Sequence, residues 1–185
     1  MSVAVRRYDP QRRDRIIDAC LDVVAEVGVA GASHRKIAEA ADVPLGSMTY
    51  HFSGMQELLH EAFSRFATSM SDRFAARMAQ ADDLASAQEG VAETIRDVFG
   101  DQRDMVLTHE LYTLAARDAS FRDLTNAWMG RSRHVLEDHF DPLTARILDA
   151  AIEGLSIHRA LDIDPQDDAV ILAAIDRIIA GATTP

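Results

Sequence analysis

The sequence predicts an all-α protein of about nine helices, with a small N-terminal domain of three helices and a larger C-terminal helical domain. Hydrophobic residues make up 48% of the 185 residues, whereas there are only nine glycines and five prolines. Apolar residues recur at spacings of three and four along most of the chain, which is the period of an amphipathic helix. The breaks in this pattern fall at glycine, at proline or at short polar clusters. We place the domains at residues 9–65 and 66–185.

The first predicted helix begins near Asp9 and Pro10. Aspartate caps a helix N-terminus, and proline fits the first turn because its missing N–H would be unpaired there. Apolar residues from Ile16 to Val27 then mark one face, and Gly28 and Gly31 end the helix.

Two shorter helices follow, at residues 34–41 and 45–52. Ser33 is placed to cap the first of them, and Pro44 separates the two because a residue before proline is displaced from helical geometry. Met48 and Phe52 fall four apart on the inner face of the second helix, which leaves its polar residues outward.

Six longer helices are predicted in the C-terminal domain. Their breaks are "ADDLAS", Gly100-Asp101, "RDAS", Asp141-Pro142 and "DIDP". The predicted ranges are 55–80, 84–99, 102–117, 120–139, 143–161 and 166–180.

The net charge of −11 is unevenly distributed. Residues 1–54 contain seven Lys or Arg and seven acidic residues, whereas residues 55–185 contain twelve Arg and twenty-three acidic residues. The acidity therefore belongs to the C-terminal domain and does not exclude nucleic-acid binding by the N-terminal one.

Two short helices joined by a tight turn, after a longer first helix, predict a helix-turn-helix motif at residues 33–52. In this motif the second helix lies in the DNA major groove and the first braces it against the backbone. A small helical unit with a solvated polar face is the alternative that spacing alone leaves open.

The N-terminal sequence resembles the DNA-binding domain of TetR-family transcriptional repressors. The resemblance covers residues 12–63 and rests on Ser33, Ile37-Ala38, Ala41-Asp42-Val43, the segment "GSMTYHF" at 46–52, and Leu58. Two positions depart from the family pattern, because Thr49 replaces the usual tyrosine and Met55 replaces the usual lysine.

The resemblance implies roles for individual residues of the motif. Arg35 is expected to reach a base edge, and Tyr50 and His51 to contact phosphates, with Ser33 as a cap beside a phosphate. The groove-facing positions are those of Leu45, Gly46, Ser47 and Thr49. Lys36 and the arginine-rich segment 6–15 are expected to add positive charge. The expected DNA-binding set is Ser33, Arg35, Lys36, Leu45, Gly46, Ser47, Thr49, Tyr50 and His51.

The resemblance also implies that the C-terminal domain dimerises and encloses a ligand pocket. Independently, the last two predicted helices carry apolar stripes wider than one neighbour needs, although an intramolecular core is the alternative. The expected homodimer interface comprises Leu148, Ala151, Ile152, Leu155, Val170, Ile171, Ala174, Ile175 and Ile178.

A Met- and aromatic-rich set in the central helices is the expected pocket, and simple core packing is its alternative. We expect the effector to be a small, largely apolar, uncharged or weakly charged molecule. The expected pocket comprises Phe74, Met78, Phe99, Met105, His109, Tyr112, Trp128 and Met129, with Phe66 and Met70 nearby.

Enzymatic function is not expected. "HELYT" and "HEAFS" lack the second histidine of a zinc-protease helix, His134 and Asp138 lack a third metal ligand, and no nucleophile or phosphate-binding glycine motif occurs. No cofactor or metal is expected.

The most probable function from the sequence is a cytoplasmic repressor that binds an inverted-repeat operator on double-stranded DNA and is released by an effector. No membrane association or signal peptide is expected, because no apolar run is long enough. The alternative is a helical ligand-binding or scaffold protein whose motif does not bind DNA.

Overall fold

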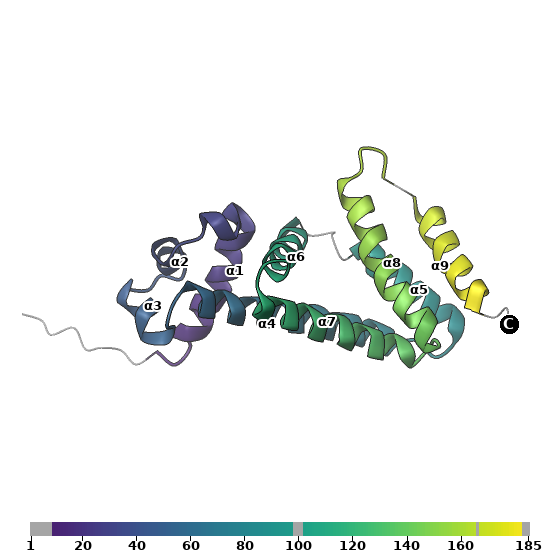
Figure 1. The fold of residues 1–185 in the computed structure, drawn as a ribbon, viewed down its shortest axis with the longest axis horizontal. Helices are drawn as coiled ribbons and strands as arrows, with labels where there is room; N and C mark the ends of the chain where they lie inside the picture. Colours follow the sequence, from purple (N-terminus) through teal and green to yellow (C-terminus); the bar gives the residue numbers. More distant parts are fainter. Residues whose placement is uncertain (1–8, 98–101, 166, 183–185) are drawn as a thin grey trace, which may run out of the picture. The chain divides into compact units, whose positions relative to one another are not determined.

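A computed structural model describes residues 9–97, 102–165 and 167–182, and within these ranges the chain forms nine α-helices and no strand (Figure 1). This confirms the predicted fold class. The chain divides into two compact units, Met1–Ser64 and Arg65–Pro185. No helix among the described residues is long and apolar enough to cross a membrane.

Helix α1 (Arg12–Gly31) supplies most of the core of the first unit. Its buried stripe includes Ile16, Ile17 and Val24, together with Cys20, whose thiol pKa is raised to about 12 by burial. Gly28 has a φ of 70°, which breaks the helical geometry where the sequence placed the end of the helix. The start differs from the prediction, because Asp9 accepts a hydrogen bond from the Gln11 N–H and the helix begins only at Arg12.

Helices α2 (His34–Ala40) and α3 (Gly46–His51) form the helix-turn-helix. The Ser33 hydroxyl caps α2 by accepting the Lys36 N–H at 3.3 Å, as expected. The turn between them places Asp42 at a φ of 51°, a left-handed conformation that aspartate tolerates better than most residues. Met48 and Phe52 are buried and anchor α3 to the unit.

Helix α4 (Met55–Met78) begins in the first unit and continues into the second. The second unit also contains five further helices. Helix α7 packs between α6 and α8, and α5 packs against both α8 and α9. These helices are α5 (Leu84–Asp97), α6 (Gln102–Ala115), α7 (Ala119–Glu137), α8 (Pro142–Leu161) and α9 (Asp168–Ala182).

Three residues expected at a dimer interface lie inside this unit. Leu148, Ile171 and Ile175 are fully buried in a cluster that α5, α8 and α9 build within one chain. The expectation that they face a partner is therefore corrected: α5 covers the stripes that seemed too wide for one neighbour.

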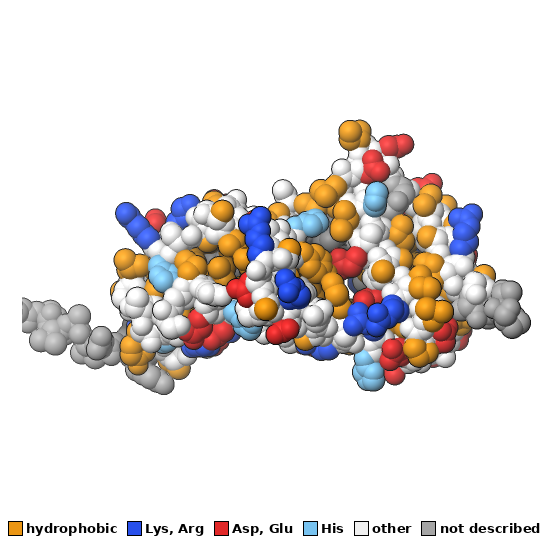
Figure 2. Space-filling model, viewed as in Figure 1, with side chains coloured by type: hydrophobic (Ala, Val, Ile, Leu, Met, Phe, Trp, Pro, Cys, Tyr) orange, Lys and Arg blue, Asp and Glu red, His pale blue; other side chains and the backbone are white. Residues whose placement is uncertain are grey.

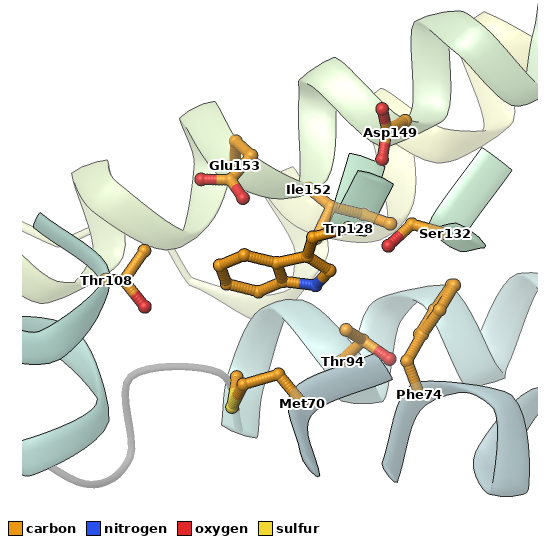
Figure 3. Close-up of a pocket in the computed structure, with 9 residues that line it drawn as sticks. All are labelled: Met70, Phe74, Thr94, Thr108, Trp128, Ser132, Asp149, Ile152 and Glu153. Carbon is orange, nitrogen blue, oxygen red and sulfur yellow. The ribbon is translucent and has the colours of Figure 1, made fainter. Parts of the chain in front are cut away.

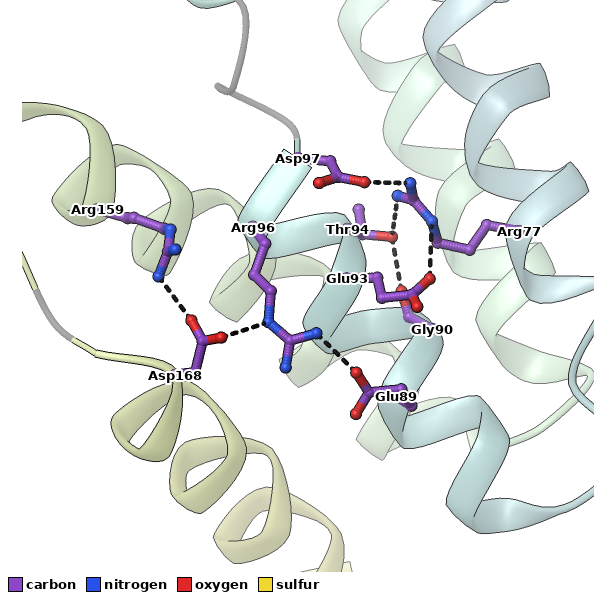
Figure 4. A network of polar contacts seen from close by, with 9 residues as sticks. All are labelled: Arg77, Glu89, Gly90, Glu93, Thr94, Arg96, Asp97, Arg159 and Asp168. Atoms are coloured by element: carbon purple, nitrogen blue, oxygen red, sulfur yellow. Dashed lines mark hydrogen bonds and ion pairs between the residues drawn. The ribbon is translucent and has the colours of Figure 1, made fainter.

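Ion pairs tie α5 to the helices around it (Figure 4). Asp168 at the start of α9 accepts from Arg96 of α5 at 3.1 Å and from Arg159 of α8 at 3.0 Å. On the other side of α5, Arg77 of α4 contacts Asp97 at 2.6 Å and the Thr94 hydroxyl at 3.2 Å. The carboxylate of Asp168 therefore links α5, α8 and α9.

Candidate nucleic-acid interface and ligand pocket

The outward face of α3 is the candidate nucleic-acid interface. Tyr50 and Leu45 are 82% and 55% exposed, and Gly46 and Thr49 are also exposed. A methyl group added at Gly46 would meet nothing within 4 Å, so the backbone there is open to a close approach. The Thr49 hydroxyl donates to the Gly46 carbonyl at 3.3 Å but remains at the surface.

Cationic side chains of α2 lie at the same motif. Arg35 is exposed and is not engaged by any described residue, whereas the Lys36 ammonium donates to the Gly31 carbonyl at 2.9 Å. Lysine has three N–H donors, so Lys36 keeps two for a further partner. Blue side chains are visible at the α2 end of the first unit in Figure 2.

Ser47 does not lie where the sequence placed it. It is only 8% exposed and lies beside buried Met48 on the inner side of α3. A six-residue helix that packs on two sides buries adjacent positions, which the four-residue spacing of Met48 and Phe52 did not reveal. The expectation that Ser47 faces base edges is corrected.

The arginines at the start of α1 are engaged within the unit. Arg15 contacts Asp9 at 2.7 Å, and Arg13 pairs with Glu61 and lies 5.1 Å from the centre of the Phe52 ring. Arg13 therefore supports Phe52, the residue that follows α3. Arg12 also pairs with Asp9, at 4.0 Å, and the arginines at positions 6 and 7 lie outside the described residues.

His51 is half-buried at the end of α3, with its ring 4.8 Å from that of Tyr50. Burial lowers the pKa of His51, and the charges of Arg12 and Arg13 lower it further. The imidazole is consequently neutral near pH 7, so that one ring nitrogen donates and the other accepts a hydrogen bond.

The candidate ligand pocket lies within the second unit, among α4, α5, α6, α7 and α8 (Figure 3). The Trp128 indole stands at its centre, and the cavity has a volume of about 50 Å³. A second cavity of about 180 Å³ shares Met70, Phe74 and Thr94 with it. The first cavity is lined by Met70, Phe74, Thr94, Thr108, Trp128, Ser132, Asp149, Ile152 and Glu153.

Only part of the expected pocket lines this cavity. Phe74 and Trp128 do, and Tyr112 borders it with its ring stacked on Trp128 at 6.2 Å and 10°. Met78 instead belongs to the hydrophobic core, while Phe99 lies outside the described residues. Three further expected residues, Met105, His109 and Met129, are half-buried and do not line the cavity.

Two carboxylates on α8 were missed by the sequence analysis. Asp149 and Glu153 are one turn apart, so they share a face with Ile152, which we expected at the dimer interface. The signal that could have revealed them is the row Asp149, Glu153 and Ser156, whose spacing of four and three continues along one side of the apolar stripe.

Burial raises the pKa of both carboxyl groups, but their partners differ. Arg133 of α7 contacts Asp149 at 3.1 Å and opposes the shift in pKa. Glu153 accepts only the Tyr112 hydroxyl, at 2.6 Å, among the described residues, and the charge of Asp149 raises its pKa further.

The solvent-facing sides of α8 and α9 carry large apolar residues. Ile147 is 44% exposed and Leu143, Leu161, Val170 and Leu172 are also exposed. Of the residues expected at a dimer interface, Val170 is on this surface, and Ala151, Leu155, Ala174 and Ile178 are half-buried. Figure 2 shows orange side chains among charged ones over these helices.

No group of three potential metal ligands occurs among the residues that the structure describes.

Comparisons with known proteins agree with this architecture. The description "Bacterial regulatory proteins, tetR family" matches residues 16–62, and "Tetracyclin repressor-like, C-terminal domain" matches residues 79–181. The "HTH-type transcriptional regulator PksA" of Bacillus subtilis (strain 168) is 26% identical over 167 residues, covering 82% of this chain and 80% of that protein.

Solved structures extend the similarity over nearly the whole chain. The protein SCO7518 of Streptomyces coelicolor A3(2) is 54% identical with a TM-score of 0.88, covering 95% of this chain and 100% of that one. The multidrug binding protein EbrR in complex with imidazole is 35% identical with a TM-score of 0.80, covering 96% and 98%. Family members are transcriptional regulators rather than enzymes, and this chain belongs to the TetR family of DNA-binding transcriptional regulators.

Proposed function

We propose that this regulator is a dimeric repressor that binds an inverted-repeat operator and is released from it by a small, largely apolar effector. The observation that carries the proposal is the outward face of α3, where exposed polar side chains stand on a helix anchored by Met48 and Phe52. Relatives named as transcriptional repressors include AcnR of Corynebacterium diphtheriae, which is 29% identical over 130 residues.

The DNA contacts divide into two kinds. Tyr50 and His51 hold phosphate oxygens, which fixes the position of α3 without reading sequence. Arg35 and Thr49 reach base edges in the major groove, where a guanidinium pairs well with guanine. Two copies of α3 related by a two-fold axis require half-sites about one helical turn, or a multiple of it, apart.

The dimer forms through the exposed sides of α8 and α9. Large apolar residues exposed on two helices that pack together favour an interaction site, and a two-fold interface lets the same surface meet itself. This places Ile147 and Val170 at the interface and leaves the buried residues Ile171 and Ile175 as its support.

The effector binds in the Trp128 pocket of the second unit. The pocket is mainly apolar with a few polar groups, which is the usual character of a small-molecule site. EbrR, a multidrug binding protein, has been crystallised with ethidium and with proflavin. This similarity supports an aromatic effector for the present chain.

Selection of bound fragments from a random DNA pool tests the operator. We expect an inverted repeat, and Tyr50→Phe should weaken binding to all selected sites nearly alike. Selected fragments without two-fold symmetry would contradict the proposed dimeric recognition. Absence of any salt-dependent binding would instead favour a helical ligand-binding protein whose motif does not bind DNA.

A matched pair of surface variants tests the dimer. Ile147→Asp places a charge in the proposed interface, so light scattering should report the mass of a monomer at micromolar concentration. Val27→Asp is the control, because Val27 is 38% exposed on α1, which belongs to the first unit. Equal masses for both variants would move the interface elsewhere.

A further inference from the structure

The pocket contains one carboxylate that has no counter-charge among the described residues. Glu153 is half-buried and lines the cavity together with Trp128, Met70 and Ile152, and Figure 3 shows its carboxylate on the opposite side of the indole from Met70. A phenol hydroxyl, that of Tyr112, is its one hydrogen-bond partner among the described residues. A buried carboxylate is costly unless it is paired with a positive charge.

The neighbouring Asp149 shows what a compensated carboxylate looks like in the same pocket. Its charge is met by Arg133 of α7 at 3.1 Å. Of the two acidic groups that line the cavity, one is therefore neutralised by the protein and one is not. This count leaves room for a single positive charge on a ligand.

Thr108 provides a second, independent sign of a ligand. It is 1% exposed, and its hydroxyl oxygen has no hydrogen-bond partner among the described residues. Buried hydroxyl groups are ordinarily paired, and a helical threonine usually donates to a carbonyl one turn back. In Figure 3 the Thr108 oxygen is turned toward the side of the pocket where Met70 and Trp128 lie.

We propose that the effector of this regulator is an aromatic monocation, with Glu153 as its counter-ion and the Trp128 indole as the surface that receives its ring. Tryptophan is the most favourable side chain for a cation over its face. A polar atom of the same molecule pairs with the Thr108 hydroxyl. This replaces the uncharged or weakly charged effector expected from the sequence, and it rests on the proposed role of the pocket as the effector site.

The size of the cavity adds a requirement. A volume of about 50 Å³ holds only one or two water molecules, so a ring system must displace side chains as it binds. Met70 is the residue suited to give way, because its unbranched side chain has several accessible rotamers. Its movement would open the cavity toward the neighbouring one of about 180 Å³, which Met70 also lines. Two arginines line that second cavity, and the protein neutralises both, because Arg73 pairs with Asp104 and Arg77 with Asp97.

Two probes that differ in charge and hardly in shape test the proposal by calorimetry without DNA. N-methylacridinium is a permanent cation, and acridine is neutral at a slightly alkaline pH. We expect wild-type protein to bind the cation about 10-fold more tightly or better, and Glu153→Gln to weaken cation binding about 10- to 100-fold while leaving acridine nearly unaffected.

The control is Glu137→Gln, which removes a charge from the exposed side of α7 and should retain the preference for the cation. Equal affinities of wild-type protein for both probes, failure of both to bind, or a preference that survives in Glu153→Gln would each overturn the proposal. Release of DNA is measured separately. A cation that binds through Glu153 but leaves DNA bound would contradict the proposed function and not this assignment.

Discussion

The outward face of α3 and the lining of the Trp128 pocket use similar residue types in opposite environments. On α3, polar side chains are exposed and two buried apolar residues hold them in place. In the pocket, polar side chains are buried or half-buried beside apolar ones. The first arrangement suits a highly charged partner that stays in water, and the second suits a small partner that leaves water, since desolvation strengthens electrostatic contacts.

The largest expected effect is on the free energy of unfolding, and it distinguishes a buried residue that anchors α3 from an exposed residue on its outward face. Met48→Ala removes a fully buried side chain and should lower the free energy of unfolding by about 2–5 kcal/mol. Leu45→Ala, at an exposed position, should change it by less than about 0.5 kcal/mol. Denaturation curves followed by circular dichroism measure both, and similar losses would show that α3 is held in another way.

The next effect is on operator affinity and concerns the residues expected to contact base edges. Arg35→Ala should reduce operator affinity by about 1–3 kcal/mol and relax preference at one symmetric pair of base positions. Ser47→Ala, on the inner side of α3, should leave that preference intact. Fluorescence anisotropy on operators altered one base pair at a time makes the comparison, and a relaxed preference in Ser47→Ala would restore it as a base contact.

A smaller effect on the free energy of unfolding is expected in the pocket, where a substitution should stabilise the protein. Glu153→Gln should raise the free energy of unfolding of the unliganded protein by about 1 kcal/mol at neutral pH, because a buried charge is removed. The pKa of Glu153 is raised on folding, so its carboxyl favours the folded state at low pH and loses that advantage as pH rises through the raised pKa.

The stability difference between wild type and Glu153→Gln should consequently vanish at acid pH. Among the described residues, the charged and titratable groups that act on this site include Tyr112 of α6, Asp149 of α8, Arg133 of α7 and, through Asp149, Arg146 of α8. Thermal unfolding as a function of pH measures the difference. A constant gap across the acid range would mean that Glu153 is not the group responsible.

The smallest effect is expected in the turn before α3. Asp42→Gly should stabilise the first unit by about 0.5–1 kcal/mol, because glycine adopts a φ of 51° without the steric cost that other residues meet. Chemical denaturation gives the change. Asp42→Ala is the matched control and should destabilise, whereas stabilisation by both substitutions would assign the effect to the lost charge.

The same comparison explains how far the sequence could be interpreted. The helix-turn-helix is local: Ser33, Met48 and Phe52 lie within twenty residues, and their spacing alone predicts a capped helix and an anchored one. Ser47 was misplaced because periodicity describes one buried face, whereas α3 is buried on two adjacent positions.

The pocket is assembled from five helices, and no local pattern connects them. Asp149 and Glu153 look like ordinary surface acids on α8 until α6 and α7 bring Tyr112 and Arg133 to them. Ile171 and Ile175 likewise looked like an exposed stripe because the sequence does not show that α5 covers them. Residues that depend on long-range packing are those that the sequence could not place.

The position of Trp128 makes its fluorescence informative about the pocket. Trp128 is the single tryptophan of the chain, and its indole lies 8% exposed at the centre of the pocket. Excitation selective for indole therefore reports on this one location, without labels and without interference from another tryptophan. Quenching or a spectral shift of its emission would follow occupancy of the pocket directly, so the protein can serve as its own fluorescent sensor in a search for ligands.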